Sequence, residues 1–209
     1  MLSYNRLLTD KDRELYQETI DLMWEFCPQT MLRKIARANV QQAFVLDTVR
    51  EFADKNQRIL SAGCYEDTAY ETLKKLGYKI IGIDPFTKLI SLEQYMDISF
   101  ENDFYIVFAT SVIEHIPNDE IFLDDICKLI KPNGYGILTM DYLDNWKPGD
   151  KLPATDIRFY TMVDLKYRLQ QVLIKNNCQV VDEGQWEGTP DFRYDGCLYS
   201  FATFVFRKS

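Results

Sequence analysis

Gly63 and Asp84, 21 positions apart, are the residues of this 209-residue chain best placed to bind a nucleoside. Gly63 follows a short apolar segment, residues 59–62, and a glycine there lets a ligand approach the backbone closely. Asp84 follows a second apolar segment, residues 80–83, where a carboxylate can accept hydrogen bonds from two ribose hydroxyls. Residues 69–76 carry apolar side chains at helical spacing, so the stretch predicts a strand, helix and strand around a nucleotide site.

The turn at Gly63 has one glycine where dinucleotide sites usually have three. A pyrophosphate therefore lacks its usual cradle, whereas a nucleoside cofactor without phosphates needs only a close turn and an acid for the ribose. Each residue also has a structural interpretation, because Gly63 can serve packing alone and Asp84 can cap the next helix.

The composition narrows the classes of function. The net charge of −8 lacks the basic footprint of a nucleic-acid-binding protein. No apolar run approaches the length of a membrane span, and the N-terminus lacks the apolar core of a signal peptide. The five cysteines show no CxxC spacing, and a single histidine argues against a zinc site. We expect a cytoplasmic protein with reduced cysteines and no bound metal; the oligomeric state stays open.

The elements that must position these residues alternate between strand and helix along most of the chain. We expect an α/β fold, a Rossmann-like three-layer sandwich, as one domain with N-terminal helices in residues 1–56 and the core in residues 57–209. The expected helices are residues 9–26, 30–54, 69–76, 87–94, 119–130 and 161–174. The expected strands are residues 59–62, 80–83, 104–109, 135–140, 178–182 and 197–206, with a loop over residues 142–158.

Five short motifs in order carry a resemblance to a known family. They are Ile59-Leu-Ser-Ala-Gly-Cys, Gly82-Ile-Asp-Pro, Asp97-Ile-Ser, Tyr105-Ile-Val-Phe-Ala-Thr-Ser-Val-Ile-Glu-His-Ile-Pro and Leu129-Ile-Lys-Pro-Asn-Gly. The set resembles the class I S-adenosylmethionine-dependent methyltransferases over residues 58–141, and more loosely beyond. Residues 157–165 and 199–208 also look like a branch associated with sugars and surface polysaccharides.

This resemblance implies a seven-stranded, mostly parallel sheet with an antiparallel last strand, and S-adenosylmethionine as the cofactor. It implies that the turn lies under the methionine moiety, that Asp84 binds the ribose, and that Asp97 with Ile98 meets the adenine. Asp97 can instead simply close a turn. The implied cofactor contacts are Ala62, Gly63, Cys64, Tyr65, Asp84, Pro85, Asp97, Ile98, Thr110 and Ser111.

Two residues depart from the family pattern. Ser61 stands where the family usually carries an acid that helps to orient the methionine ammonium group, and Tyr65 stands where it has a second glycine. Glu66 or Asp67 can replace the lost acid, and Tyr65 resembles a variant turn found among relatives.

The acceptor side is expected at the ends of the later strands. Methyl transfer is an in-line displacement, and a base that takes a proton from an acceptor hydroxyl contributes about 10²–10⁴-fold. His115 is the first candidate for this base and Asp141 the alternative, although His115 also suits a structural role. Tyr142, Arg158 and Tyr160 are expected acceptor contacts, the last two equally well explained as a salt bridge and a core aromatic.

The sequence therefore predicts an S-adenosylmethionine-dependent methyltransferase that methylates a hydroxyl of a small molecule, sugar or glycan. A non-catalytic member of the same fold that binds a partner protein is the second hypothesis, supported by Ser61. An NAD-dependent dehydrogenase is the third, favoured by Asp84 and opposed by the missing glycines.

Overall fold

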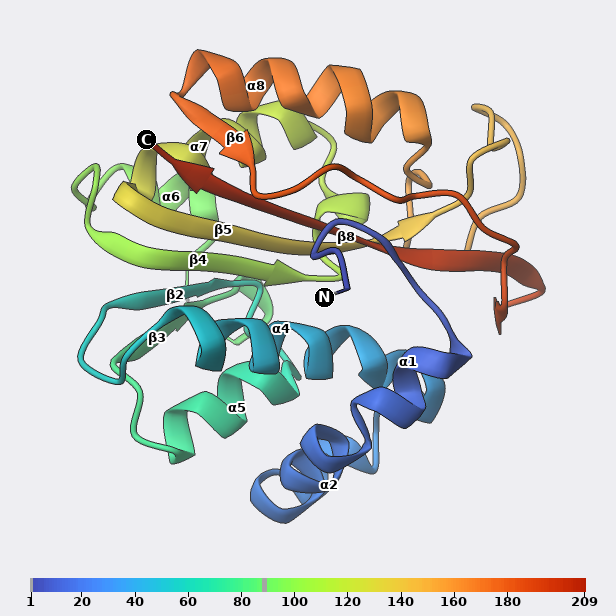
Figure 1. The fold of residues 1–209 in the computed structure, drawn as a ribbon, viewed down its shortest axis with the longest axis horizontal. Coiled ribbons are helices and arrows are strands. Elements are labelled where there is room, and N and C mark those ends of the chain that lie inside the picture. Colours follow the sequence, from blue (N-terminus) through green and yellow to red (C-terminus); the bar gives the residue numbers. More distant parts are fainter. Residues whose placement is uncertain (1, 88–89) are drawn as a thin grey trace.

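The computed structural model describes residues 2–87 and 90–209, and a mixed β-sheet crosses its centre (Figure 1). Four neighbouring strands are parallel, in the order β3 (Ile80–Ile83), β2 (Ile59–Ala62), β4 (Phe104–Thr110) and β5 (Ile130–Tyr142). The long strand β8 (Cys197–Lys208) runs antiparallel beside β5. Three short strands pair with β8, namely β1 (Leu7–Leu8), β6 (Cys178–Val180) and β7 (Phe192–Tyr194).

Helices cover both faces of the sheet, as Figure 1 shows. One face carries α4 (Asn39–Phe52) and α5 (Thr68–Lys75), with α1 (Asp10–Leu15), α2 (Gln17–Phe26) and α3 (Pro28–Met31) packed beyond them. The other face carries α6 (Leu92–Met96), α7 (Asp119–Leu129) and α8 (Leu169–Lys175), which a π-helical turn at Asp164–Arg168 precedes. Short 3₁₀ turns lie at Ala36–Ala38, Pro85–Thr87 and Ile113–His115. This is the expected three-layer arrangement.

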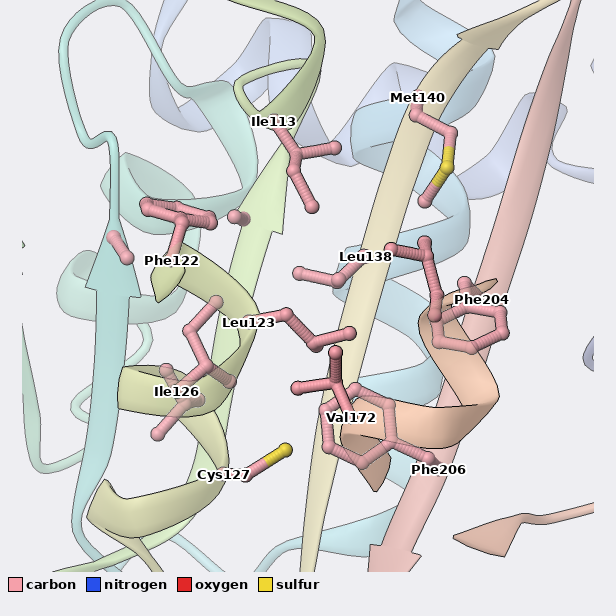
Figure 2. Packing of buried hydrophobic residues seen from close by; sticks show 14 of the residues in the cluster. Ile113, Phe122, Leu123, Ile126, Cys127, Leu138, Met140, Val172, Phe204 and Phe206 are labelled. Atoms are coloured by element: carbon pink, nitrogen blue, oxygen red, sulfur yellow. The ribbon is translucent and has the colours of Figure 1, made fainter. Parts of the chain in front are cut away.

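The sheet is buried on both faces because each face packs against its own apolar cluster. Alternate residues of a strand point to opposite faces, so Phe108 packs toward α4 and Val107 toward α7. Figure 2 shows the apolar cluster on the face that α7 covers, where Leu123 of α7 packs near Leu138 of β5. Burying each such side chain contributes about 1.5–3 kcal/mol. Sheet-buried strands read as continuous apolar runs, which is why β4 was predictable from sequence.

The expected strands all form, with differences in length and number. The last strand is antiparallel as expected, but the sheet has eight strands within the described residues, not seven. The unexpected members are β1 and β7, both too short to give a periodic signal. β5 begins at Ile130, five residues earlier than expected.

The N-terminal helices are more broken than expected. The expected helix over residues 9–26 is split at Tyr16, and the one over residues 30–54 is replaced by α3, a 3₁₀ turn and α4. Leu32 and Ile35 fit the helical period of residues 30–54, but they are 69% and 41% exposed because they lie in the break between α3 and α4. The expected helix over residues 87–94 falls partly on residues 88–89, outside the described residues, and α6 begins only at Leu92.

In the described part of the chain, no helix has both the length and the apolar character that crossing a bilayer requires.

Candidate active site

Four parallel strands, β2 to β5, end at the same edge of the sheet, where open α/β sheets place their ligands. Side chains alternate along each strand, so Ser61, Thr110 and Asp141 all point to the face covered by α4. These three polar residues are 0%, 6% and 5% exposed. A buried polar row therefore crosses the sheet just below its carboxyl edge.

Gly63 turns the chain after β2. Its φ of +105° is a conformation that favours glycine, and a Cβ on it would lie 2.4 Å from a methyl carbon of Val112. The backbone N–H groups of Gly63 and Cys64 donate to the Ile83 carbonyl at 2.8 and 3.2 Å. The packing role foreseen for Gly63 is thus real, and it fixes the turn beside the end of β3.

Asp84 joins the turns that follow β2 and β3. Its Oδ2 accepts a hydrogen bond from the Tyr65 N–H at 3.1 Å, and its Oδ1 accepts one from the Phe86 N–H at 2.8 Å. Each carboxylate oxygen keeps a second lone pair, so a ribose diol still finds two acceptors of fixed orientation. The contact with Phe86 also holds the 3₁₀ turn, so the capping role and a binding role are compatible.

The two candidate replacements for the acid lost at Ser61 have different partners. Glu66 forms a 2.6 Å ion pair with Arg33, which lies just after the end of α3. Asp67 caps α5 through a 2.9 Å hydrogen bond from the Tyr70 N–H to its Oδ1. Burial raises the pKa of Asp67, and its Oδ2 has no hydrogen-bond partner among the described residues.

The Oγ of Ser61 and the Oγ1 of Thr110 are also buried and lack partners within residues 2–87 and 90–209. Buried polar atoms are rarely left unpaired in native proteins unless a ligand or water completes them. Together with the Gly63 turn and Asp84, these atoms fit a polar nucleoside cofactor carrying an amino-acid group.

The other expected cofactor contacts lie around the same edge. Cys64 is buried, and burial with the nearby charge of Asp84 raises the pKa of its thiol to about 11. Tyr65 is half exposed, with its ring centroid 5.9 Å from that of Phe86. Ala62 is buried at the end of β2, Pro85 is exposed, and Asp97 and Ile98 form an exposed turn after α6.

Ser111 turns the chain after β4 with a φ of +54°. Its N–H donates to the carbonyl of Thr139 at 3.1 Å, and its hydroxyl donates to Oε1 of Glu114 at 2.7 Å. Glu114 has no exposed surface, so Ser111 orients a fully buried carboxyl group.

A group of ionisable residues, hereafter the carboxyl cluster, lies beside the ends of β4 and β5. It consists of Glu114, Asp141, Asp156 and His115. The Nδ1 of His115 lies 3.2 Å from Oδ1 of Asp156 and 3.0 Å from the Thr155 carbonyl. No sequence pattern indicates Asp156, because it belongs to an irregular loop 15 positions beyond Asp141. A backbone hydrogen bond of 3.2 Å from Ile157 to Glu114 brings that loop to the site.

Burial and neighbouring charges together set the pKa values of the residues in the carboxyl cluster. Burial would lower the pKa of His115, but the hydrogen bond to Asp156 and the charge of Glu114 outweigh burial and raise it to about 9. Burial raises the pKa of Asp141 well above its usual range, and the neighbouring charges of Glu114 and Asp156 add to this effect. Burial likewise raises the pKa of Glu114. At neutral pH, His115 is therefore an imidazolium ion.

The three side chains expected to contact the acceptor form hydrogen bonds or ion pairs with other residues of the protein. Tyr142 is buried, and its hydroxyl donates to the Trp186 carbonyl at 2.9 Å. Tyr160 has no exposed surface, and its hydroxyl donates to Asp119 at 2.8 Å. Arg158 pairs with the same Asp119 at 2.8 Å. All three side chains hold the 143–158 loop and its neighbours in place, which agrees with the structural interpretation of Arg158 and Tyr160.

Two comparisons with known sequences place this chain. Residues 24–183 match the model of a family described as methyltransferase domain. The "Ubiquinone biosynthesis O-methyltransferase" of Nitrobacter winogradskyi is 24% identical over 184 residues, covering 69% of each chain. A relative of the same name from Bradyrhizobium diazoefficiens is 30% identical over 107 residues, covering 43% of this chain and only 42% of that protein.

Solved structures share the fold. The 1,6-didemethyltoxoflavin-N1-methyltransferase of Burkholderia thailandensis, solved with S-adenosylhomocysteine, has a TM-score of 0.57 at 16% identity, covering 97% of this chain and 92% of that one. A putative S-adenosylmethionine-dependent methyltransferase from Listeria monocytogenes has a TM-score of 0.53 at 12% identity, covering 81% and 98%.

Proposed function

The chain belongs to the methyltransferase domain family and is an S-adenosylmethionine-dependent methyltransferase, and we propose that it methylates a hydroxyl group of a small molecule or sugar. Two observations support oxygen as the methylated atom. The relatives carry the name O-methyltransferase. A buried acid, Asp141, stands at the end of β5 with a raised pKa, as suits a group that takes a proton from a hydroxyl.

We assign cofactor binding to the turn after β2 and to Asp84. The turn at Ala62, Gly63, Cys64 and Tyr65 would face the methionine moiety, and Asp84 would accept the ribose hydroxyls. Asp97 with Ile98 would meet the adenine, and Thr110 with Ser111 would form the floor. Asp67 would take the part of the missing acid, because Glu66 is already paired with Arg33.

The chain's own task is placement, because bound S-adenosylmethionine supplies a methyl group that its sulfonium charge has already activated. The protein must hold the acceptor oxygen a little over 3 Å from that methyl, on the far side from sulfur. A hydrogen bond from the Ile157 N–H to the Glu114 carbonyl holds the loop over residues 143–158 beside the end of β4, where we propose that it helps to exclude water.

Asp141 is the better candidate for the base. His115 is already protonated at neutral pH, so it cannot accept a proton there, and its charge instead balances Asp156. Burial favours the protonated form of Asp141, so Asp141 acts as the base only when it is ionised, and an ionised carboxylate with a raised pKa takes up a proton more readily than an ordinary one. We therefore propose that Asp141 accepts the proton and that His115 provides the compensating charge.

A non-catalytic member of the fold remains the second candidate, and Ser61 favours it. The family's acid is missing there, and the Ser61 hydroxyl has no partner in the described parts of the chain. Weak cofactor binding with no turnover would be its signature.

Thermal shift and tritiated-methyl transfer separate these candidates. An O-methyltransferase is stabilised by S-adenosylmethionine and by its demethylated product, is not stabilised by NAD, and transfers label to a hydroxyl acceptor from a broad panel. Stabilisation without any transfer favours the non-catalytic candidate, and no stabilisation by either sulfur compound contradicts the proposed methyltransferase function.

A further inference from the structure

Three carboxyl oxygens of the carboxyl cluster have no donor of another described residue within hydrogen-bond distance. Oε2 of Glu114, Oδ1 of Asp141 and Oδ2 of Asp156 are buried without a hydrogen-bond partner anywhere in the described residues. The three side chains are at least nine-tenths buried. An unpaired buried polar group costs about 1–3 kcal/mol, and more when it is charged.

The first turn of α4 adds two more acceptors of the same kind. Gln41 and Gln42 are each 2% exposed, and their Oε1 atoms find no donor in residues 2–87 or 90–209. A helix position that packs on a sheet is normally apolar, as Val45 is one turn later. Two amides at this place therefore call for a polar partner.

The geometry places Gln41 near the end of β5. Phe52, near the end of α4, packs on Tyr135 of β5 with ring centroids 4.4 Å apart. Gln41 lies on the same stripe of the helix, 11 residues and about 16 Å earlier. Asp141 lies six residues and about 20 Å along β5 from Tyr135. α4 and β5 run in opposite directions (Figure 1), so Gln41 and Asp141 lie at the same edge of the sheet.

Two buried acids of the carboxyl cluster also lack a counter-ion in the part of the chain that the structure describes. Within the described residues, His115 is the one cationic side chain in the cluster, and it already pairs with Asp156. Glu114 and Asp141 have no second cation of these residues beside them, so burial favours their protonated forms. The Tyr199 hydroxyl, from β8, interacts with Asp141, and burial and that carboxyl raise the pKa of Tyr199. A cation bound beside Glu114 and Asp141 would stabilise their ionised forms. No group of three such donors in the described parts of the chain has the spacing to hold a metal ion.

We propose that the carboxyl cluster and the first turn of α4 bind an ammonium group of the acceptor, which is therefore a hydroxylated amine such as an amino alcohol or an amino sugar. An ammonium group brings three donors and a full positive charge, whereas a neutral hydroxyl brings one donor. Hydrogen bonds between charged partners are roughly twice as strong as neutral ones. The inference rests on the proposed function, because it describes the acceptor of the same site.

Matched pairs of probes test it on the full-length protein loaded with S-adenosylhomocysteine. The pairs are ethanolamine with ethylene glycol, glucosamine with glucose, and dopamine with 4-ethylcatechol, each titrated by calorimetry. We expect the amine of at least one pair to bind about tenfold or more tightly than its neutral partner, as charge-assisted contacts predict. Equal binding within every pair, no binding of any amine at millimolar concentration, or displacement of the amine by Mg²⁺ would overturn the proposal.

Variants localise the effect. Glu114→Gln and Gln41→Met should each reduce the preference for the amine at least several-fold, whereas Glu101→Gln, an equal charge change at an exposed position, should leave it unchanged. Circular dichroism and S-adenosylhomocysteine affinity show whether each variant is folded. A preference for the amine that persists in both Glu114→Gln and Gln41→Met refutes the assigned site. If the unmodified protein does not bind S-adenosylhomocysteine, the proposed function is refuted instead.

Discussion

The Nδ1 of His115 lies 3.2 Å from Oδ1 of Asp156, although 40 residues separate them in the chain. The contact ties the irregular loop before Ile157 to the 3₁₀ turn at the end of β4. It also determines the state of the histidine, since the carboxylate helps to raise the pKa of His115 to about 9. The one histidine of the chain is thereby a charged partner in the fold, and the proton acceptor must be sought beside it.

Replacing His115 should make stability depend less on pH. A raised pKa in the folded state means that the contribution of His115 is complete below pH 6.5 and is lost as the pH rises through about 9. The free energy of unfolding of His115→Gln should therefore fall below that of the parent at pH 6, and the two should converge by pH 10. Urea denaturation at several pH values measures this. A constant difference across that range would show that the imidazole is not charged through Asp156.

Asp119 should be the main electrostatic anchor of the loop over residues 143–158. Its carboxylate pairs with Arg158 and Arg168 at 2.8 and 2.9 Å and accepts the Tyr160 hydroxyl. Burial opposes its ionisation, but these partners hold the pKa of Asp119 below its usual value. Its contribution is thus present above about pH 4 and lost as the pH falls through the lowered folded pKa.

Asp119→Asn should therefore lower the free energy of unfolding by about 3 kcal/mol at pH 7, because it leaves two arginines without their buried partner. Glu120→Gln is the matched control, since Glu120 contacts the same Arg168 at 3.2 Å but its side chain is 55% exposed. That change should cost less than about 1 kcal/mol. Equal losses in the two variants, measured by chemical denaturation, would contradict this assignment.

Asp84 should govern cofactor affinity. Both of its oxygens are oriented by backbone N–H groups, and the ribose hydroxyls would donate to the remaining lone pairs. Asp84→Asn should weaken S-adenosylhomocysteine binding about 10- to 100-fold, the range for hydrogen bonds to a charged group. Calorimetry measures this, with the exposed Asp54→Asn as control. Unchanged affinity in a folded Asp84→Asn protein would leave Asp84 with a structural role alone.

Asp67 and Glu66 give a second paired test at the same turn. Asp67→Asn should weaken S-adenosylhomocysteine binding about tenfold, because its Oδ2 is the buried oxygen left free in the described residues. Glu66→Gln should affect binding little, since Glu66 already faces Arg33. The reverse order of the two affinities would move the role of the missing acid from Asp67 to Glu66.

Sequence alone predicted the parts of the fold whose burial is complete. β4 is buried on both faces and reads as an unbroken apolar run, and the turn at Gly63 follows a strand in the same way. The break between α3 and α4 was missed because Leu32 and Ile35 fit a helical period although they face solvent. β1 escaped because two residues form no pattern, and only pairing with β8 makes them a strand.

The candidate site divides in the same way. Asp84 and Asp141 end recognisable strands, so their place at the sheet edge follows from the chain order. Asp156, Gln41 and Gln42 could not be foreseen, because a loop and a helix start are brought to that edge by tertiary packing. The charged state of His115 was equally hidden, since it depends on Asp156.

Transfer of a ¹³C-labelled methyl group tests the central claim most directly. The protein is incubated with S-adenosylmethionine labelled at its methyl carbon and with the hydroxyl acceptors found in the tritium screen, and carbon NMR identifies the atom that carries the label. We predict a methyl group bound to oxygen, formed by the parent protein and slowed about 10²–10⁴-fold in Asp141→Asn with S-adenosylhomocysteine affinity unchanged. Label on nitrogen or carbon, or equal rates in the two proteins, would contradict hydroxyl methylation with Asp141 as the base.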